Sequence, residues 1–145
     1  MYFIDRSKIE EILKYMEKLL AELNQQTFPS FKEKLGLERI THMFIESTLD
    51  VGNMMIDGFI MRDPGSYEDI IDILVDEEVL PEQDKDVYKK VIRLRKQLVR
   101  DYLAIDHEEL AMIMLESKSV IERFSTHIRS YLNNELGVAN AFTNK

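Results

Sequence analysis

An all-α fold is predicted by three features of the 145-residue sequence. Apolar residues recur every three or four positions through five separate segments, which is the spacing of one helix face. Five glycines and three prolines are too few for a turn-rich β fold, and no useful stretch alternates apolar and polar residues as a strand does. With 45% hydrophobic residues, a chain of this length predicts one domain with a sizeable core.

The first two helices are predicted from their apolar spacing. Asp5 is the expected N-cap of the first helix, which the connector around Pro29 ends. The second and longest helix is predicted over residues 37–62, and its apolar residues extend well beyond one face. Such a helix is buried on two sides, so we expect it at the centre of the bundle or shared with a second subunit.

Three further helices complete the predicted bundle. Ser66 is the expected N-cap of a short third helix, after a turn at residues 63–65. The fourth helix begins after the acidic residues 82–84, which suit the positive end of its dipole, and carries apolar positions as far as Leu103. The fifth begins at Asp106, another expected N-cap, and continues an apolar stripe over about six turns.

The whole chain, residues 1–145, is predicted to be a single helical domain. Residues 134–145 are polar and rich in small residues, so this end is expected to fray. The absence of Cys excludes disulfides and thiolate metal sites, and the first residues lack the features of a signal peptide. No apolar run approaches the ~18 residues of a membrane span, so we expect a cytoplasmic protein that does not contact the membrane.

One predicted helix is strongly basic, although the net charge of the chain is −8. Residues 85–100 contain seven of the 19 basic residues of the chain and a single acidic residue, Asp86. We call these seven basic residues the basic segment. Two interpretations remain open: a solvated face paired with acidic neighbours, or a surface that contacts phosphate or an acidic partner. The basic segment consists of Lys85, Lys89, Lys90, Arg93, Arg95, Lys96 and Arg100.

Sequence motifs of the common enzyme classes are absent. There is no phosphate-binding loop, no Gly-x-Gly-x-x-Gly, no His-Glu-x-x-His and no nucleophile elbow. His42 and His127 lie among apolar neighbours on predicted helices and are interpreted as structural or surface residues. Glu46, Asp50 and Asp57 could hold a metal, but without Glu-x-x-His pairs they are better interpreted as a solvated stripe. No metal or cofactor is predicted.

The most informative stretch is residues 94–106, Leu-Arg-Lys-Gln-Leu-Val-Arg-Asp-Tyr-Leu-Ala-Ile-Asp. It resembles the motif of the HepT-like proteins, a branch of the HEPN superfamily of all-helical bacterial RNase toxins. That motif begins with Arg and a polar residue, and after three further residues it has His. One residue later comes Tyr, and a short apolar run then leads to Asp. Arg95, Lys96 and Tyr102 stand at the matching places, and Arg100 stands at the place of the His. The predicted helix order extends the resemblance over most of the chain.

The resemblance implies a HEPN-type antiparallel bundle of about five helices that forms a homodimer. In such proteins the motifs of two chains meet in a cleft at the dimer interface and cleave RNA without a metal. Arg95 would stabilise the charged phosphorane, and Tyr102 matches the tyrosine that a minimal nucleotidyltransferase (MNT) antitoxin modifies with AMP. The candidate catalytic residues are therefore Arg95, Arg100 and Tyr102. The candidate RNA- or partner-binding residues are Lys89, Arg93 and Lys96.

Arg100 is the main departure from the family pattern, because a guanidinium cannot exchange protons near neutral pH. The resulting prediction is the toxin subunit of a toxin–antitoxin pair whose RNA cleavage is weak or lost. The alternative is a non-catalytic dimeric module that binds a partner protein, a nucleotide or RNA in the same basic cleft. In a shifted register His107, six residues after Arg100, would be the motif His.

Helical spacing adds an expectation about this site. Arg95 and Tyr102 are seven residues apart, so a regular helix places both on one face. Arg100 joins them only if the helix loosens near its end or if a second subunit completes the site.

Overall fold

Every regular element in the described part of the chain, residues 4–143 of a computed structural model, is a helix. Side chains are described through residue 136. The α-helices are α1 (Arg6–Ala21), α2 (Phe31–Gly58), α3 (Tyr67–Asp76), α4 (Lys85–Arg93), α5 (Arg95–Val99), α6 (His107–Ile121) and α7 (Phe124–Thr143). Two short 3₁₀ turns, η1 (Glu82–Asp84) and η2 (Tyr102–Ala104), precede α4 and follow α5.

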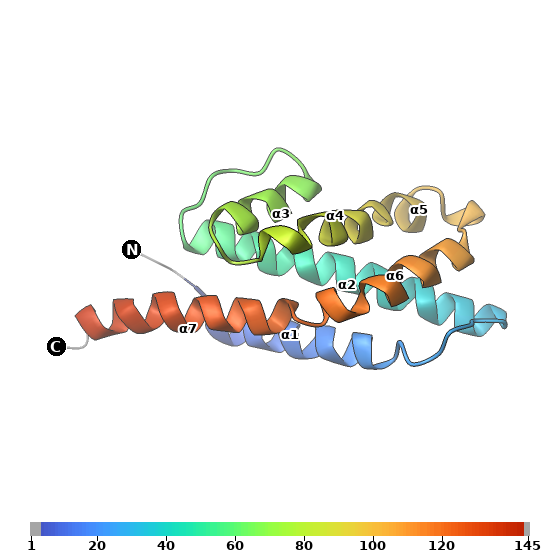
Figure 1. The fold of residues 1–145 in the computed structure, drawn as a ribbon, viewed down its shortest axis with the longest axis horizontal. Coiled ribbons are helices and arrows are strands. Elements are labelled where there is room, and N and C mark those ends of the chain that lie inside the picture. The colour runs from blue at the N-terminus through green and yellow to red at the C-terminus, as the bar shows by residue number, and fades with distance from the viewer. Residues whose placement is uncertain (1–3, 144–145) are drawn as a thin grey trace.

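The helices form an antiparallel bundle, as Figure 1 shows. Helix α1 runs along the molecule, α2 returns beside it, α4 and α5 run forward again, and α6 and α7 return. The predicted all-α bundle of about five helices is confirmed, with the fourth and fifth each divided into two consecutive segments. The first and last helices begin and end at the same end of the bundle, and η2 lies at the opposite end.

Side-chain caps fix where the helices begin. Asp5, Ser66 and Asp106 cap α1, α3 and α6, as predicted, each accepting a hydrogen bond from the backbone three residues later. Helix α2 begins at Phe31 rather than at residue 37, because Ser30 and Glu33 form a reciprocal capping box that the sequence analysis did not identify.

Helix α2 lies at the centre of the bundle. It packs against α1, α3, α5 and α6, so its wide apolar surface is covered by the same chain. The open choice between a central helix and one shared with a second subunit is therefore resolved in favour of the centre. The end of α2 also differs from the prediction, since the helix stops at Gly58 and Ile60 adopts a left-handed φ of 57°.

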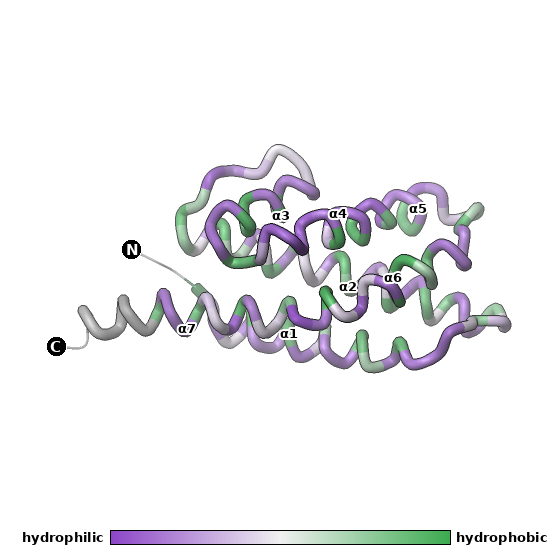
Figure 2. The backbone as a smooth tube through the Cα atoms, in the orientation of Figure 1, coloured by the Kyte–Doolittle hydropathy of each residue, from purple (hydrophilic) through white to green (hydrophobic). Residues whose placement is uncertain are grey.

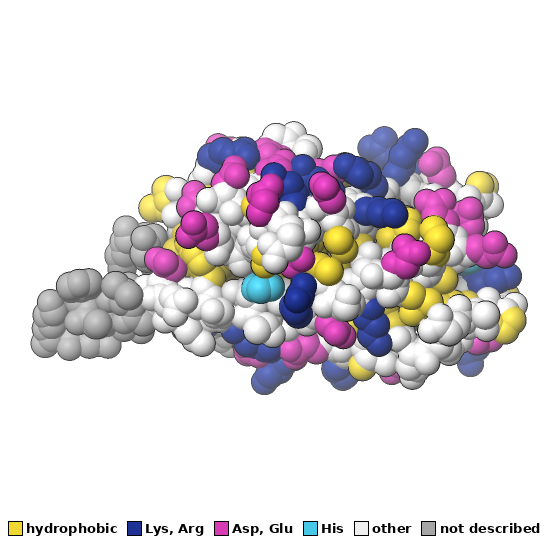
Figure 3. Space-filling view, in the orientation of Figure 1, with side chains coloured by type: hydrophobic (Ala, Val, Ile, Leu, Met, Phe, Trp, Pro, Cys, Tyr) yellow, Lys and Arg dark blue, Asp and Glu magenta, His cyan; other side chains and the backbone are white. Residues whose placement is uncertain are grey.

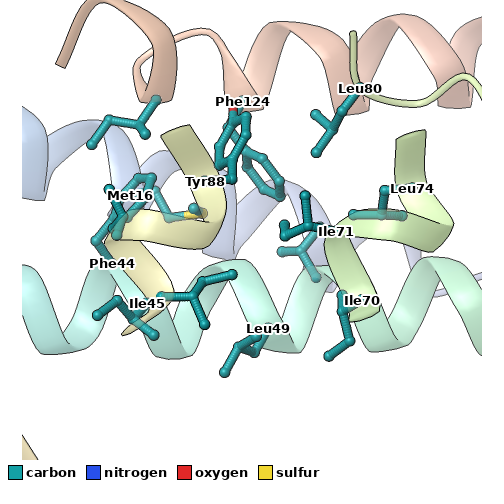
Figure 4. Close-up of a cluster of buried hydrophobic side chains, with 14 of the residues drawn as sticks. Met16, Phe44, Ile45, Leu49, Ile70, Ile71, Leu74, Leu80, Tyr88 and Phe124 are labelled. Atoms are coloured by element: carbon teal, nitrogen blue, oxygen red, sulfur yellow. The ribbon is translucent and has the colours of Figure 1, made fainter. Parts of the chain in front are cut away.

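The core is continuous along the bundle. Figure 4 shows Tyr88 of α4 and Phe124 of α7 above apolar side chains of α2 and α3. The centroids of these two rings lie 5.9 Å apart, and the rings pack edge to face. Hydrophobic and hydrophilic turns interleave along the helices in Figure 2, as expected when one face of each is buried. No helix in the described range is long and apolar enough to cross a membrane.

The last helix, α7, includes most of the residues that were expected to fray. Its backbone is helical to Thr143, and residues 144–145 lie outside the described part. The extent of a frayed end and the single-domain prediction for residues 1–145 stay predictions.

Candidate functional site

The predicted fourth helix is interrupted, and the interruption shapes the candidate site. Helix α4 ends at Arg93, the buried Leu94 separates the two segments, and α5 continues only to Val99. The backbone N–H of Asp101 then bonds the carbonyl of Lys96, five residues back, at 3.2 Å. The prediction of one helix reaching Leu103 is wrong because this wider turn ends α5.

Arg95 is held in place by residues from two other helices. Its Nε donates to Glu46 Oε1 of α2 at 2.6 Å, and its guanidinium carbon lies 4.6 Å from the centroid of the Tyr67 ring. The hydrogen bond to Glu46 is the main cause of the raised pKa of Arg95. No described residue accepts a hydrogen bond from its terminal Nη1 and Nη2 groups, so two oriented donors remain on a side chain that is 27% exposed.

Arg95 borders a hollow between the start of α3 and α5, which we call the α3–α5 hollow. Its volume is about 460 Å³. Four basic side chains and one carboxylate border it, so its charge favours an anionic ligand. The hollow is lined by Ser66, Tyr67, Glu68, Ile92, Arg93, Arg95, Lys96 and Arg100.

Arg100 shares the α3–α5 hollow with Arg95. It follows the last residue of α5, where the helical path loosens, as the spacing argument required. No described residue forms an ion pair with Arg100. Three arginines, Arg93, Arg95 and Arg100, therefore border one hollow within a single chain.

Tyr102 lies apart from the two arginines. It begins the separate turn η2 and is not among the residues that line the α3–α5 hollow. The expectation that Arg95 and Tyr102 share one helix face is wrong, because α5 ends between them. The Tyr102 residue is 63% exposed.

Most of the basic segment is paired with acidic neighbours. Lys89 lies 2.7 Å from Asp72, and Arg93 makes two hydrogen bonds to Glu68. Figure 3 shows basic and acidic side chains interspersed over α3 and α4, with a group of basic side chains over α5. The interpretation as a paired, solvated face therefore holds for the α4 part, including the predicted binding residue Lys89.

The α5 part of the basic segment is less neutralised. Lys96 is 77% exposed at the side chain, and its nearest acidic partner is Asp101 at 3.9 Å. Together with Arg95 and Arg100 it keeps the positive charge at the α3–α5 hollow.

Sequence reasoning missed three residues around Arg95. The sequence indicates Glu46 only as part of a carboxylate stripe and His42 only as a structural or surface residue, and it does not single out Tyr67. The Nε2 atom of His42 lies 3.4 Å from Oε1 of Glu46, the same oxygen that holds Arg95. The four-residue spacing of His42 and Glu46 on α2 was the available signal.

His107 occupies a different place. It is the first residue of α6, and its Nε2 lies 2.7 Å from Oε2 of Glu38. It faces a separate cavity of about 710 Å³, bordered by the connector between α1 and α2 and the first turns of α6. The shifted register would need His107 in the α3–α5 hollow, and it does not line that hollow.

The carboxylate stripe of α2 shows no arrangement for a metal. Glu46 is engaged by Arg95, and burial, followed by the charge of Glu46, raises the pKa of Asp50. Nowhere in residues 4–136 do three potential metal-ligating side chains gather.

Comparisons with known proteins place this geometry in a family. The chain is 52% identical over 143 residues to YutE of Bacillus subtilis (strain 168), which is named as a candidate RNase, and the match covers 98% of this chain and 99% of YutE. A solved structure of YutE, described as a cytosolic protein, superposes with a TM-score of 0.91 at 52% identity over 94% of this chain and 96% of that one.

A second solved structure shares the fold at lower identity. It is a toxin–antitoxin structure with AMP-PNP, with a TM-score of 0.72 and 16% identity over 83% of this chain and 96% of that chain. The family model described as Ribonuclease HepT-like matches residues 9–128. The chain belongs to the HepT-like ribonuclease family.

Proposed function

We propose that this protein is the toxin subunit of a toxin–antitoxin pair and that it binds RNA at the α3–α5 hollow and cleaves it weakly. The observation that carries the proposal is the arrangement of Arg95. Glu46 and Tyr67 hold its guanidinium so that both terminal nitrogens remain available. A fixed guanidinium with paired donors suits the oxygens of a phosphodiester, in the ground state and in the charged phosphorane.

Weak cleavage follows from the chemistry of Arg100. A guanidinium binds phosphate well but stays protonated near neutral pH, so it cannot take up or release the protons that the reaction moves. Positioned acid–base groups typically contribute ~10²–10⁴-fold to rate. A hollow lined by three arginines therefore favours binding of the RNA backbone over fast chemistry.

An antitoxin partner is the second part of the proposal. Exposed Tyr102 is accessible to a modifying enzyme, which supports its role as the acceptor of AMP from an MNT-type nucleotidyltransferase. The toxin–antitoxin structure that shares this fold was solved with AMP-PNP. Mass spectrometry of the protein from its native cells should find AMP on Tyr102 and not on Tyr67, which is also half exposed. A homodimer and a cytoplasmic location belong to the same proposal.

The alternative is a dimeric module that binds RNA, a nucleotide or a partner protein in the α3–α5 hollow without cleaving RNA. Arg100 at the place of the motif His favours it. The two functions share the binding surface and differ only in whether labelled RNA is cut.

The experiment measures binding and cleavage of a fluorescent single-stranded RNA across a series of salt concentrations. We expect affinity to fall steeply with salt, and Arg95→Ala to weaken binding and reduce the slope of log affinity against log salt by ~1, as loss of one phosphate contact predicts. Lys90→Ala is the matched control, because Lys90 is exposed in the same basic segment but does not line the hollow.

Binding that is independent of salt, or that Lys90→Ala and Arg95→Ala weaken equally, would contradict the proposed site. Slow cleavage by the natural protein supports the ribonuclease, and binding without any cleavage supports the alternative module.

A further inference from the structure

Tyr67 is the aromatic residue that lines the α3–α5 hollow. It is the first residue of α3, and Ser66 caps this helix by accepting a hydrogen bond from the backbone N–H of Asp69. The capped helix start therefore fixes the backbone of Tyr67 at the border of the hollow. Because the residue is 50% exposed, a ligand in the hollow can reach its side chain.

The Tyr67 ring is covered on one face only by a charged group. The guanidinium carbon of Arg95 lies 4.6 Å from the ring centroid. No aromatic ring of the described residues packs against Tyr67. With half of the residue's surface in solvent, part of the ring remains free to receive a second flat group.

Cations surround this ring at the α3–α5 hollow. Arg95, Lys96 and Arg100 line the hollow with it, and the volume of about 460 Å³ is within the range of sites that accept a small ligand. Proteins that bind single-stranded nucleic acids combine cations that follow the phosphates with aromatic side chains on which the bases stack. The hollow presents both kinds of group to one ligand.

We propose that Tyr67 stacks against a nucleobase of the bound RNA while Arg95 holds the adjacent phosphate. This inference rests on the proposed RNA binding and names its substrate class as RNA with an unpaired nucleotide. The base and the phosphate of one nucleotide are joined through a single ribose. Since Tyr67 and Arg95 are in contact, one nucleotide can meet both side chains.

Stacking on Tyr67 makes the hollow selective for single strands. In an RNA duplex the bases are paired and stacked inside the helix, so their flat faces are closed to a protein side chain. In a single strand they can turn outwards. Every base has a flat face, so only a modest preference among base sequences is expected.

The experiment measures the affinity of three labelled RNAs by fluorescence anisotropy: a single strand, the duplex of the same sequence, and a strand of equal length that lacks the bases. We expect the natural protein to bind the single strand most tightly. Tyr67→Ala should weaken this binding by a factor on the order of 10, the loss of one stacked base. Tyr67→Phe is the matched control and should keep the affinity, because the ring remains.

The strand without bases separates stacking from the contact between Tyr67 and Arg95. A ring that only orients the arginine acts on the phosphate alone. Tyr67→Ala would then weaken binding of the strand without bases as much as binding of the complete strand, and this result would overturn the proposal. We expect instead that Tyr67→Ala changes little for the strand without bases and for the duplex.

A fluorescent side chain in place of Tyr67 reports the stacking directly. The natural chain contains no Trp, so Tyr67→Trp introduces a single indole at the hollow. Its emission should be quenched by the complete single strand and not by the strand without bases. Tyr15→Trp is the matched control, because Tyr15 is 41% exposed on α1 and does not line the hollow, and its emission should not change.

The outcomes separate this inference from the function on which it rests. RNA binding that weakens with salt and on Arg95→Ala, but is unchanged by Tyr67→Ala, overturns the stacking role and leaves the RNA-binding hollow standing. Equal affinity for the single strand and the duplex also overturns the stacking role. If the natural protein binds none of the three RNAs, the proposed function fails and this inference fails with it.

Discussion

Glu46 has the most consequential position of any single residue in the candidate site. A buried or half-buried carboxylate fixes the direction of an arginine by accepting from Nε, which leaves the far edge of the guanidinium for a ligand. The Tyr67 ring covers one face of the same group and limits its motion further. Arg95 is therefore oriented before any phosphate arrives, and little side-chain entropy is lost on binding.

The first prediction concerns Arg100. Replacing Arg100 with His should raise the rate of RNA cleavage by a factor on the order of 10², because it places a group that titrates near pH 7 in the α3–α5 hollow. RNA affinity should fall slightly, since one cation is lost. Single-turnover kinetics at pH 7 measure the rate, and a filter-binding titration measures the affinity.

Lys96→His is the control for this gain, because Lys96 lines the same hollow outside the position of the motif His. Equal gains in the two variants would show that any histidine in the hollow suffices and that position 100 has no special geometry.

The sequence predicted some of these residues and missed others for a physical reason. Arg95 and Arg100 lie within one short motif, so their residue types and spacing were visible. Glu46 and Tyr67 are distant in sequence from Arg95, and only the packing of α2 and α3 against α5 brings them to it. His42 was interpreted from its apolar neighbours in sequence, so its contact with Glu46, one helical turn away, was not predicted.

At the scale of helices, the close contact of α2 with α3 depends on one glycine. A Cβ at Gly52 would lie 2.5 Å from Cγ2 of Ile70, a buried and stiff β-branched side chain. The two helices therefore approach closely enough to exclude even a methyl group at this position.

The second prediction follows from this contact. Gly52→Ala should lower the free energy of unfolding by about 1 kcal/mol, because an overpacking cost of 1–3 kcal/mol exceeds the helix-propensity gain of about 1 kcal/mol. Gly36→Ala is the matched control in the same helix, where nothing lies within 4 Å of the added methyl, and it should stabilise. Urea unfolding measures both, and stabilisation of both variants would contradict the tight contact.

The third prediction concerns the ion pairs between α1 and α7. Arg129 binds Glu10 at 2.7 Å and Glu17 at 2.8 Å, and these hydrogen bonds are the main cause of the lowered pKa of each carboxylate. A carboxylate with a lowered folded-state pKa stabilises the fold above its unfolded pKa of about 4.3 and loses this contribution as pH falls through the folded value.

Arg129→Gln should therefore lower the melting temperature at pH 7 by about 2–4 °C, which corresponds to roughly 1 kcal/mol for partly exposed pairs. The difference from the natural protein should shrink as pH falls below about 4. Arg39→Gln is the control, since no described residue forms an ion pair with Arg39. A difference that stays constant from pH 7 to pH 3 would mean that these carboxylates do not contribute through their charge.

The element boundaries were predictable where a side chain defines them and not elsewhere. Asp5, Ser66 and Asp106 have the chemistry of N-caps, so three helix starts could be placed from the sequence. The end of α5 has no Gly or Pro to mark it. Gln97 accepts the backbone N–H of Asp106 at 2.8 Å, which ties the connector back to α5, and such a contact cannot be read from composition.

At the scale of the whole molecule, the surface available for a second copy differs from the one that the sequence indicated. From Leu37 onward, α2 packs against α1, α3, α5 and α6 of the same chain, so this part of the helix no longer supports the homodimer. Large exposed apolar residues instead occur near the η2 end of the bundle, on α5, η2 and the starts of α2 and α6 (Figure 3). They are Phe31, Leu35, Val99, Tyr102, Leu103 and Met112.

The fourth prediction is a homodimer that uses this end. Light scattering at micromolar concentration should give twice the mass of one chain, because a monomer would leave these apolar side chains in water. Leu103→Lys should shift the mass towards one chain, since Leu103 is 92% exposed. Ile60→Lys is the control, because Ile60 is also exposed but lies at the end of α2 far from η2. A single-chain mass for the natural protein would remove the prediction.

The fold class itself was predictable because helical periodicity is a property of the sequence alone. The sequence alone does not predict whether the apolar surface of a helix packs against its own chain or against a second one, because the same residues are buried in either case.

Both ends of the described chain lie at one end of the bundle, away from α5 and η2. A fusion partner, fluorescent label or surface tether joined to this end of α1 or α7 is therefore kept away from α5 and η2. Protein immobilised through α1 or α7 should present α5 and η2 outward, towards the bulk solution. Single-molecule or biosensor measurements of RNA capture can therefore attach the protein at either terminus.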